Sequence, residues 1–217
     1  MSAELPELSL DEFHRRLAAA SPAPVAPEVL GRLFAHYQEL RRWNPSLSLV
    51  GPAAAADVVE RHYAESLAGV PLLPPAARVL VDVGSGAGFP GFVLAAARPE
   101  LDVTLVEPRQ RRWSFLLAAC RRAALPCRCL DARVERPLAP GLPESLDVIT
   151  TRALKLPPEA LGALAQRLAP GGRVLVWAGE AEPVAPPGLV RVGERPIAGS
   201  RHRRIVELIL AAGNQSQ

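Results

Sequence analysis

From Arg78 onward, short apolar runs alternate with stretches of helical pattern, and this alternation limits the fold more than any other feature of the chain. Helices between the runs predict βαβ units with right-handed crossovers. Most of the runs are almost continuously apolar, as expected for strands of a parallel sheet covered on both faces. The predicted strands are 79–83, 103–106, 127–130, 147–150 and 173–177, with helices at 89–98, 109–124 and 157–168. Segments 189–192 and 204–210 are expected to add an antiparallel hairpin at one edge, so the predicted fold class is α/β with a mostly parallel sheet.

The first third of the chain has a helical pattern instead. A capping box at Ser9 to Glu12 opens a short helix that is expected to end near Ala20. Pro27 stands in the first turn of an amphipathic helix that is expected to end at 43–45, and residues 54–69 form a third helix.

Prolines at positions 71, 74 and 75 mark a linker between the helical part and the α/β part. We therefore divide the chain into a helical N-terminal extension, residues 1–75, and an α/β domain, residues 76–217. A chain of 217 residues is too short for two large domains.

Composition excludes several classes of protein. With 49% hydrophobic and 22% charged residues, the chain has enough apolar material to fold. Its apolar runs fall short of the ~18 residues of a membrane span, and its start is acidic where a secretory signal would be basic and then apolar. We expect a cytoplasmic protein with no membrane partner. The three cysteines and four histidines have no metal-ligand spacing, so neither a disulfide framework nor a metal site is predicted.

Positive charge is concentrated in one segment. Residues 1–77 carry a net charge of −3 and residues 78–217 a net charge of +6. Residues 109–136 contain eight arginines against two acids. A run of charge is commonly a solvated helix face, but one this one-sided also suits a polyanion such as nucleic acid.

A glycine-rich segment follows the first predicted strand directly and runs from Val81 to Gly88. Glycines there allow a sharp turn and a close approach to a ligand at a helix N-terminus. The spacing also satisfies the dinucleotide pattern GxGxxG. Asp82, two residues before Gly84, and the Leu-Ala-Pro-Gly-Gly segment at 168–172 instead resemble class I methyltransferases. In those enzymes the acid faces the methionine end of S-adenosylmethionine.

Glu107 ends the second predicted strand, where a carboxylate can accept both ribose hydroxyls of a nucleoside. This position indicates adenosine without choosing between the two classes of cofactor. Asp131 is a rival acid for an adenine contact.

The segment after the fourth strand, 150–155, narrows the acceptor of a methyl group. It lacks the Asn/Asp-Pro-Pro-aromatic motif of enzymes that methylate exocyclic amines, and it lacks a cysteine that could attack a pyrimidine. An acceptor with a free lone pair, such as a purine ring nitrogen, needs only alignment with the methyl group.

Several motifs in order resemble the RsmG family, also called GidB, bacterial methyltransferases that modify N7 of a guanine in 16S ribosomal RNA. The most distinctive motif is the Gly-Phe-Pro-Gly extension at 88–91. The others are Trp43-Asn44, Arg61-His62 with Ser66-Leu67, Arg98-Pro99, Glu107, Arg111-Arg112 with Phe115-Leu116, Thr151-Arg-Ala153 and Arg201-His202. The resemblance implies a class I, Rossmann-like methyltransferase domain, S-adenosylmethionine as cofactor, and 16S ribosomal RNA or the small ribosomal subunit as partner.

The resemblance also implies roles for individual residues. Arg152 is expected to be catalytic and to lie at the mouth of the active site. The expected cofactor contacts are Gly84, Ser85, Gly86, Gly88, Phe89, Glu107, Val134, Glu135 and Arg152. The expected RNA contacts are Arg61, His62, Arg111, Arg112, Arg122, Arg201 and His202.

A helical projection of 109–124 places Arg111 and Arg122 opposite an apolar stripe, so both are expected to face outward. The stripe comprises Trp113, Leu116, Leu117, Cys120 and Ala124. Phe115 falls beside the arginines, and we expect it to pack under the N-terminal helices.

The chain departs from the family pattern at Ser48, Val50, Glu65 and Ala178. Three other functions therefore stay open at the level of sequence. The first is a class I methyltransferase that acts on another RNA, a protein or a small molecule. The second is a nucleotide-binding oxidoreductase, and the third is an RNA-binding module without activity.

Overall fold

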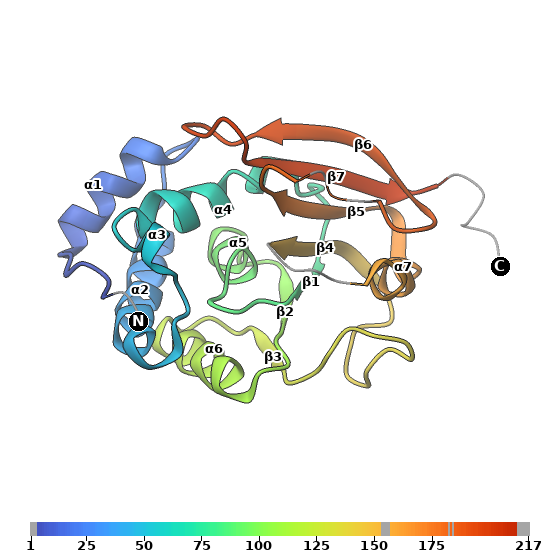
Figure 1. Ribbon diagram of the computed structural model, residues 1–217, viewed down its shortest axis with the longest axis horizontal. Helices are drawn as coiled ribbons and strands as arrows, with labels where there is room; N and C mark the ends of the chain where they lie inside the picture. The colour runs from blue at the N-terminus through green and yellow to red at the C-terminus, as the bar shows by residue number, and fades with distance from the viewer. Residues whose placement is uncertain (1–3, 153–156, 182, 184, 212–217) are drawn as a thin grey trace.

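A seven-stranded sheet runs through the centre of the computed structural model, which describes residues 4–152, 157–181, 183 and 185–211 (Figure 1). The strand order is β3-β2-β1-β4-β5-β7-β6. Strands β1 to β5 are parallel, and β7 pairs antiparallel with both β5 and β6. The strands are β1 Val79–Val83, β2 Asp102–Val106, β3 Arg128–Leu130, β4 Leu146–Arg152, β5 Leu168–Ala178, β6 Leu189–Pro196 and β7 Arg204–Leu210. The predicted fold class, a mostly parallel sheet with an antiparallel edge hairpin, is confirmed.

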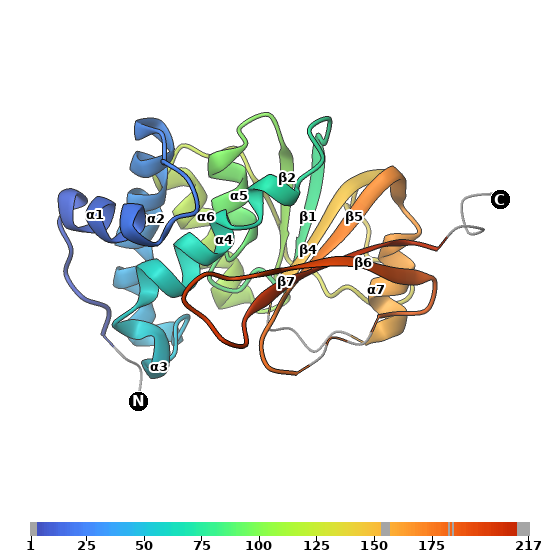
Figure 2. The same ribbon diagram turned by 90° about the horizontal axis from the view of Figure 1, so that it is seen from above.

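Helices cover both faces of the sheet. Figure 2 shows α5 and α6, together with the N-terminal helices, on one face and α7 on the other. The helices are α1 Leu10–Ala20, α2 Pro27–Leu47, α3 Pro52–Ala55, α4 Glu65–Leu67, α5 Gly91–Ala97, α6 Gln110–Arg122 and α7 Pro158–Ala165. A π-helix, Val59–Ala64, precedes α4, and a short 3-10 helix, Val70–Leu72, follows it. Each face has its own hydrophobic cluster, which explains the almost continuously apolar strands.

The N-terminal helices share one hydrophobic cluster with α5, α6 and a face of the sheet. Phe115 is fully buried in it, with ring contacts to Trp43 and His36 of α2. The expected packing of Phe115 under the N-terminal helices is therefore confirmed. The two parts of the chain on either side of residue 75 are packed around this common cluster. Their division into an extension and a domain stays a prediction.

The predicted apolar stripe of α6 was wrong in part. Leu117 is 36% exposed and Ala124 is exposed, whereas Phe115 and Ala119 are fully buried. The helix packs against α2 as well as the sheet, so its buried sector is centred between these two layers. A projection that assumes one buried face misses that rotation.

Two N-terminal helices also differ from the prediction. Helix α2 continues through Pro45 to Leu47, and Ser48 ends it in a left-handed conformation with φ 48°. Asn44 stabilises this end, because its buried side chain accepts a hydrogen bond from the Val50 amide at 2.7 Å. The predicted helix at 54–69 is divided into α3, the π-helix and α4. A π-turn of this kind often lies at a functional site.

No helix in the described part of the chain is long and apolar enough to cross a membrane. Within the same residues, His, Cys, Asp and Glu do not gather in threes as a metal site would require. The cysteines are free, with the sulfur atoms of Cys120 and Cys129 4.0 Å apart. Ala153, which closes the predicted Thr-Arg-Ala motif, lies outside the described residues, as does the end of the predicted domain at 217.

Gly91 is expected to be essential for packing α5 against the sheet. An added Cβ atom would lie 2.5 Å from Asp82 Cβ and 2.6 Å from Leu105 Cδ2. Gly91→Ala should lower the free energy of unfolding by about 1 to 3 kcal/mol, measured by urea denaturation. Gly31→Ala is the matched control: nothing lies within 4 Å of its added Cβ, so it should gain roughly 0.5 to 1 kcal/mol as a helical residue. Equal effects of the two changes would contradict the close approach.

Candidate active site

A cavity of about 530 Å³ opens at the carboxyl ends of β1 to β4. We call it the strand-end cavity. It lies where open α/β sheets bind ligands. Of the residues predicted to bind the cofactor, all but Gly88 line it: Gly84, Ser85, Gly86, Phe89, Glu107, Val134, Glu135 and Arg152. Two residues predicted to bind RNA, His62 and Arg112, line it as well.

The glycine-rich loop forms the floor of the strand-end cavity. Gly86 has φ 53°, and an added Cβ would lie 3.8 Å from Arg112 Nη1 and 3.9 Å from Glu107 Oε2. These are ordinary contact distances, so glycine is favoured here by the positive φ, which other residues rarely adopt. Gly88, with φ 87°, is turned to the core instead, where its Cβ would meet His36 Nε2 at 3.0 Å. Gly88 does not line the cavity, and its predicted contact to the cofactor stays a prediction.

Asp82 was expected to face the methionine end of the cofactor, but it lies behind the loop. Its side chain is completely buried and is not part of the cavity wall. Thr150 donates a hydrogen bond to its Oδ1 at 2.6 Å. Burial raises the pKa of the Asp82 carboxyl to about 6, although hydrogen bonds from Thr150, Ser85 and Gly91 act to lower it. Asp82 is thus part of the packing beneath the glycine-rich loop and connects β1 to β4 through Thr150.

The carboxylate of Glu107 is held rigidly at the end of β2. Its Oε2 accepts a hydrogen bond from the Gly86 amide and its Oε1 one from the Arg109 amide, both at 3.0 Å. Each oxygen keeps a further lone pair for a ligand in the cavity. The geometry fits the two hydroxyls of a ribose. Asp131, the rival acid, is exposed and outside the cavity wall.

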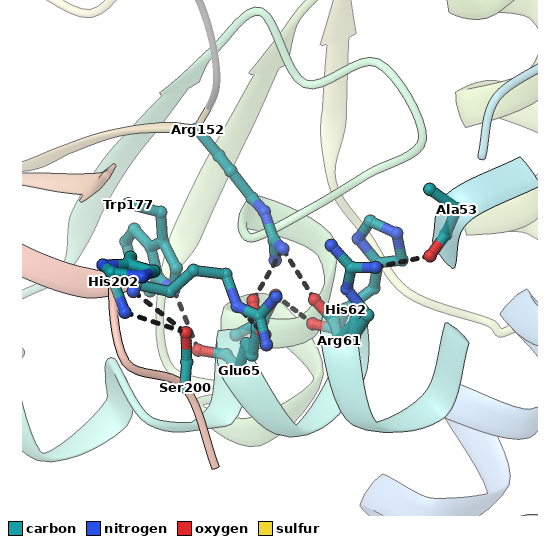
Figure 3. A network of polar contacts seen from close by, with 10 residues as sticks. Ala53, Arg61, His62, Glu65, Arg152, Trp177, Ser200 and His202 are labelled. Atoms are coloured by element: carbon teal, nitrogen blue, oxygen red, sulfur yellow. Dashed lines mark hydrogen bonds and ion pairs between the residues drawn. The ribbon is translucent and has the colours of Figure 1, made fainter. Parts of the chain in front are cut away.

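Arg152, at the end of β4, is fixed by a buried network (Figure 3). Its Nη2 donates to the Arg61 carbonyl at 2.6 Å and to Glu65 Oε2 at 2.7 Å. Glu65 Oε1 pairs with Arg203 at 2.7 Å, and the Glu65 carbonyl accepts a hydrogen bond from Trp177 at 2.8 Å. Burial raises the pKa of the Glu65 carboxyl, and the two arginines oppose this shift. Arg152 Nη1 is buried and has no partner among the described residues, so one donor group of this fixed arginine is left unsatisfied.

His62, on the π-helix, stacks on Phe89 with ring centroids 4.9 Å apart and planes at 22°. Neither ring nitrogen has a hydrogen-bond partner among the residues that the structure describes. Burial, with the charges of Arg152, Arg61 and Arg203, lowers the pKa of His62 to about 3. The ring is therefore neutral at physiological pH.

The other predicted RNA contacts lie outside the cavity wall, with Arg61 and His202 around the network of Figure 3 and Arg111 and Arg122 on α6. Arg201 and His202 are exposed before β7, and Arg61 is half-buried, with its guanidinium bonded to the Ala53 carbonyl. Arg111 and Arg122 are exposed as expected, but Arg122 donates to Gln38 at 2.6 Å and lies 3.4 Å from Glu39 on α2.

Sequence reasoning missed several residues of the cavity wall: Leu49, Pro108, Arg109, Ala132, Arg133 and Pro157. Arg109 and Arg133 carried a signal, because each closely follows a predicted strand and belongs to the arginine-rich segment. The helical projection directed attention to Arg111 and Arg122 instead.

The sheet order, the glycine loop and the carboxylate at the end of β2 define a class I methyltransferase that uses S-adenosylmethionine. A family model described as "rRNA small subunit methyltransferase G", GidB, matches residues 30–183. The chain belongs to this family.

Curated relatives agree. Ribosomal RNA small subunit methyltransferase G of an Anaeromyxobacter species is 38% identical over 171 residues, which cover 77% of this chain and 79% of the relative. The protein of the same name from Rhodospirillum centenum is 42% identical over 149 residues, which cover 68% of this chain and 66% of the relative.

Solved structures support the fold alone. The mitomycin 7-O-methyltransferase MmcR matches with a TM-score of 0.55 and 18% identity, covering 95% of this chain and 74% of its own. A mutant of MtNAS in complex with S-adenosylmethionine matches with a TM-score of 0.57 and 13% identity, covering 93% and 77%. The family assignment excludes the oxidoreductase that the glycine pattern had left open.

The buried, neutral His62 predicts part of the acid sensitivity of the fold. Its pKa is about 3 when folded and about 6.5 when unfolded. The unfolded state therefore takes up a proton first, and stability falls as the pH drops from 6.5 toward 3. Between pH 7.5 and pH 5, His62→Phe should remove about 2 kcal/mol of this decrease, measured by urea denaturation at both pH values.

At pH 7.5 the same variant should be at least as stable as the parent, because it removes two unpaired buried nitrogens. Some acid sensitivity should remain, since the pKa of buried His36 is also lowered to about 3. Identical decreases in parent and variant would show that His62 is not buried as a neutral ring.

Proposed function

We propose that this protein transfers a methyl group from S-adenosylmethionine to N7 of a guanine in 16S ribosomal RNA, as free RNA or in the small ribosomal subunit. The observation that carries the proposal is Arg152, which is fixed at the wall of the strand-end cavity with Nη1 unpaired within the described part of the chain. The names of the family and of its curated members supply the RNA. This substrate agrees with the cytoplasmic location that the sequence predicts.

The residues of the strand-end cavity divide into two groups in this proposal. Gly84, Ser85 and Gly86 shape the space for the cofactor, Glu107 accepts hydrogen bonds from its ribose, and Val134 with Glu135 contact its adenine. The cofactor supplies an electrophilic methyl group. Phe89, His62 and Arg152 form a second part of the wall, next to the π-helix.

Arg152 is assigned to the acceptor base. Guanine N7 must keep its lone pair free for attack, so Arg152 Nη1 donates to O6 or to a neighbouring phosphate. Attack by a ring nitrogen requires no proton removal, and alignment supplies much of the acceleration. The neutral, unbonded imidazole of His62 is consistent with a site that needs no general base.

The direct test is mass spectrometry of nucleosides from 16S ribosomal RNA of cells with and without the gene. Loss of one 7-methylguanosine, restored by the parent gene, is expected. If 16S ribosomal RNA is unchanged and the methyl group is found on another RNA, a protein or a small molecule, that molecule is the substrate instead. Binding of S-adenosylmethionine without any transfer would favour the RNA-binding module without activity.

Glu107 is predicted to be a main determinant of cofactor affinity. Glu107→Ala removes hydrogen bonds to a charged group and should weaken binding of S-adenosylmethionine by ~1.5 to 3 kcal/mol, measured by calorimetry. Asp131→Ala is the control, since it removes an exposed acid nearby and should leave the affinity unchanged. A larger loss of affinity in Asp131→Ala than in Glu107→Ala would indicate that Asp131, and not Glu107, binds the adenosine.

Arg152 is predicted to act on the acceptor and not on the cofactor. Arg152→Lys keeps the charge but cannot bond Glu65, Arg61 and a ligand with one planar group. Single-turnover methylation should fall about 100-fold or more, on the scale of a lost preorganised donor, while cofactor affinity changes little. Glu65→Gln should slow transfer less, because Glu65 only positions Arg152. An unchanged rate in Arg152→Lys would remove Arg152 from the active site.

A further inference from the structure

The charges around the strand-end cavity do not match the cofactor. Four arginines line it and one of them, Arg152, is paired with Glu65, so three remain against two glutamates, Glu107 and Glu135, while His62 is neutral. The arginines are Arg109, Arg112, Arg133 and Arg152. S-adenosylmethionine carries a sulfonium and an ammonium group against one carboxylate, so it is itself a net cation. An excess of arginine around a cationic cofactor indicates a second, anionic ligand.

Two of these arginines are free to bind it. Arg109 and Arg133 are exposed, and their guanidinium groups form no hydrogen bond or ion pair with any residue that the structure describes. By contrast, Arg152 is held by Glu65 and Arg122 by Gln38. Arg109 follows β2 and Arg133 follows β3, and these parallel strands are neighbours in the sheet. The two side chains therefore rise from adjacent loops at one side of the cavity mouth.

The N-terminus of α6 adds to the attraction for an anion. Arg109 is the N-cap residue, its side chain makes no capping bond, and the first turn holds Arg111 and Arg112 without an acid. Cations are unfavourable at this end of a helix, where the macrodipole is positive. Glu107, whose Oε1 accepts the Arg109 amide, brings one negative charge close to this end, against the three positive charges of Arg109, Arg111 and Arg112. An anion bound at this place would relieve the repulsion.

We propose that Arg109 and Arg133, here called the arginine rim, bind backbone phosphates of the RNA strand whose base enters the strand-end cavity. This inference rests on the proposed function and adds where the backbone of the RNA lies. Arginine suits phosphate because its planar group can donate two parallel hydrogen bonds. Contacts of this kind position a nucleic acid without reading its sequence.

The arginine rim also reassigns the arginine-rich segment. Arg112 is half-buried against the glycine loop, and Arg122 stabilises the contact between α6 and α2. Arg111 lies 3.5 Å from the Ser46 carbonyl. In this proposal the arginines of residues 109–136 have different roles. Arg109 and Arg133, next to the cavity mouth, face the substrate, whereas Arg122 belongs to the packing of α6 on α2.

The test compares two double variants with the same change of charge. Arg109→Gln/Arg133→Gln removes the arginine rim. Arg15→Gln/Arg121→Gln removes two exposed arginines elsewhere, one on α1 and one at the far end of α6. Affinity for a 16S ribosomal RNA transcript is measured over a series of salt concentrations, together with affinity for S-adenosylmethionine and methyl transfer at low RNA concentration.

The rim variant should bind the transcript more weakly, with a log–log salt slope shallower by roughly 1.4 to 1.8 for two lost phosphate contacts. The control variant should keep the slope of the parent. Cofactor affinity should stay within about twofold in both, and at low RNA concentration the rim variant should lose methyl transfer in proportion to its loss of affinity for the transcript.

Three results would overturn the arginine rim. The first is an equal slope in rim variant and parent while the parent methylates the transcript. The second is an equal change in both double variants, which would show general charge attraction. The third is a loss of cofactor affinity in the rim variant, which would assign the two arginines to the cofactor. A parent that neither binds nor methylates the transcript or the small ribosomal subunit, but binds an acidic peptide through the rim, would instead overturn the proposed function.

Discussion

The buried carboxylate of Glu65 connects the N-terminal helices to the working end of the sheet. Its two oxygens pair with Arg152 at the end of β4 and Arg203 before β7, and its carbonyl accepts the indole N–H of Trp177 on β5. A buried charge is costly without partners, so removing any one of these groups leaves the others unsatisfied. The position of Arg152 in the strand-end cavity therefore depends on a residue 87 positions earlier in the chain.

This connection explains why the N-terminal helices belong to the active site and are not an appendage. The π-helix supplies the Arg61 carbonyl that bonds Arg152, and it places His62 on Phe89 of the glycine loop. The same helices share a hydrophobic cluster with α5 and α6. Packing of the N-terminal helices against the sheet thus completes the cavity wall beside Arg152, while the strand ends and the loops after them form the rest of it.

Electrostatics separates the arginines of the chain by task. Arg152 shares the carboxylate of Glu65 with Arg203 and has one buried donor without a partner among the described residues, which suits a directed hydrogen bond to a base. Arg122 is bonded to Gln38 on α2, which suits helix packing. Arg109 and Arg133 have no partner among the described residues and flank a cavity built for a cationic cofactor, which suits phosphate. The number of arginines in a segment therefore says less than the partners that each one finds.

The sequence by itself determined the order of strands and helices, the glycine loop and the carboxylate at the end of β2. These features depend on apolar periodicity and on residues that directly follow a predicted strand, such as the glycine loop after β1 and Glu107 after β2. Only the tertiary structure decided that Asp82 lies behind the loop, that Gly88 faces His36, and how far α6 is rotated. The partners of each long arginine side chain were decided there too, because Gln38 and Arg122 are 84 positions apart and meet only when α2 packs on α6. Ion pairs and the facing of side chains across such distances are set by packing, which local periodicity does not contain.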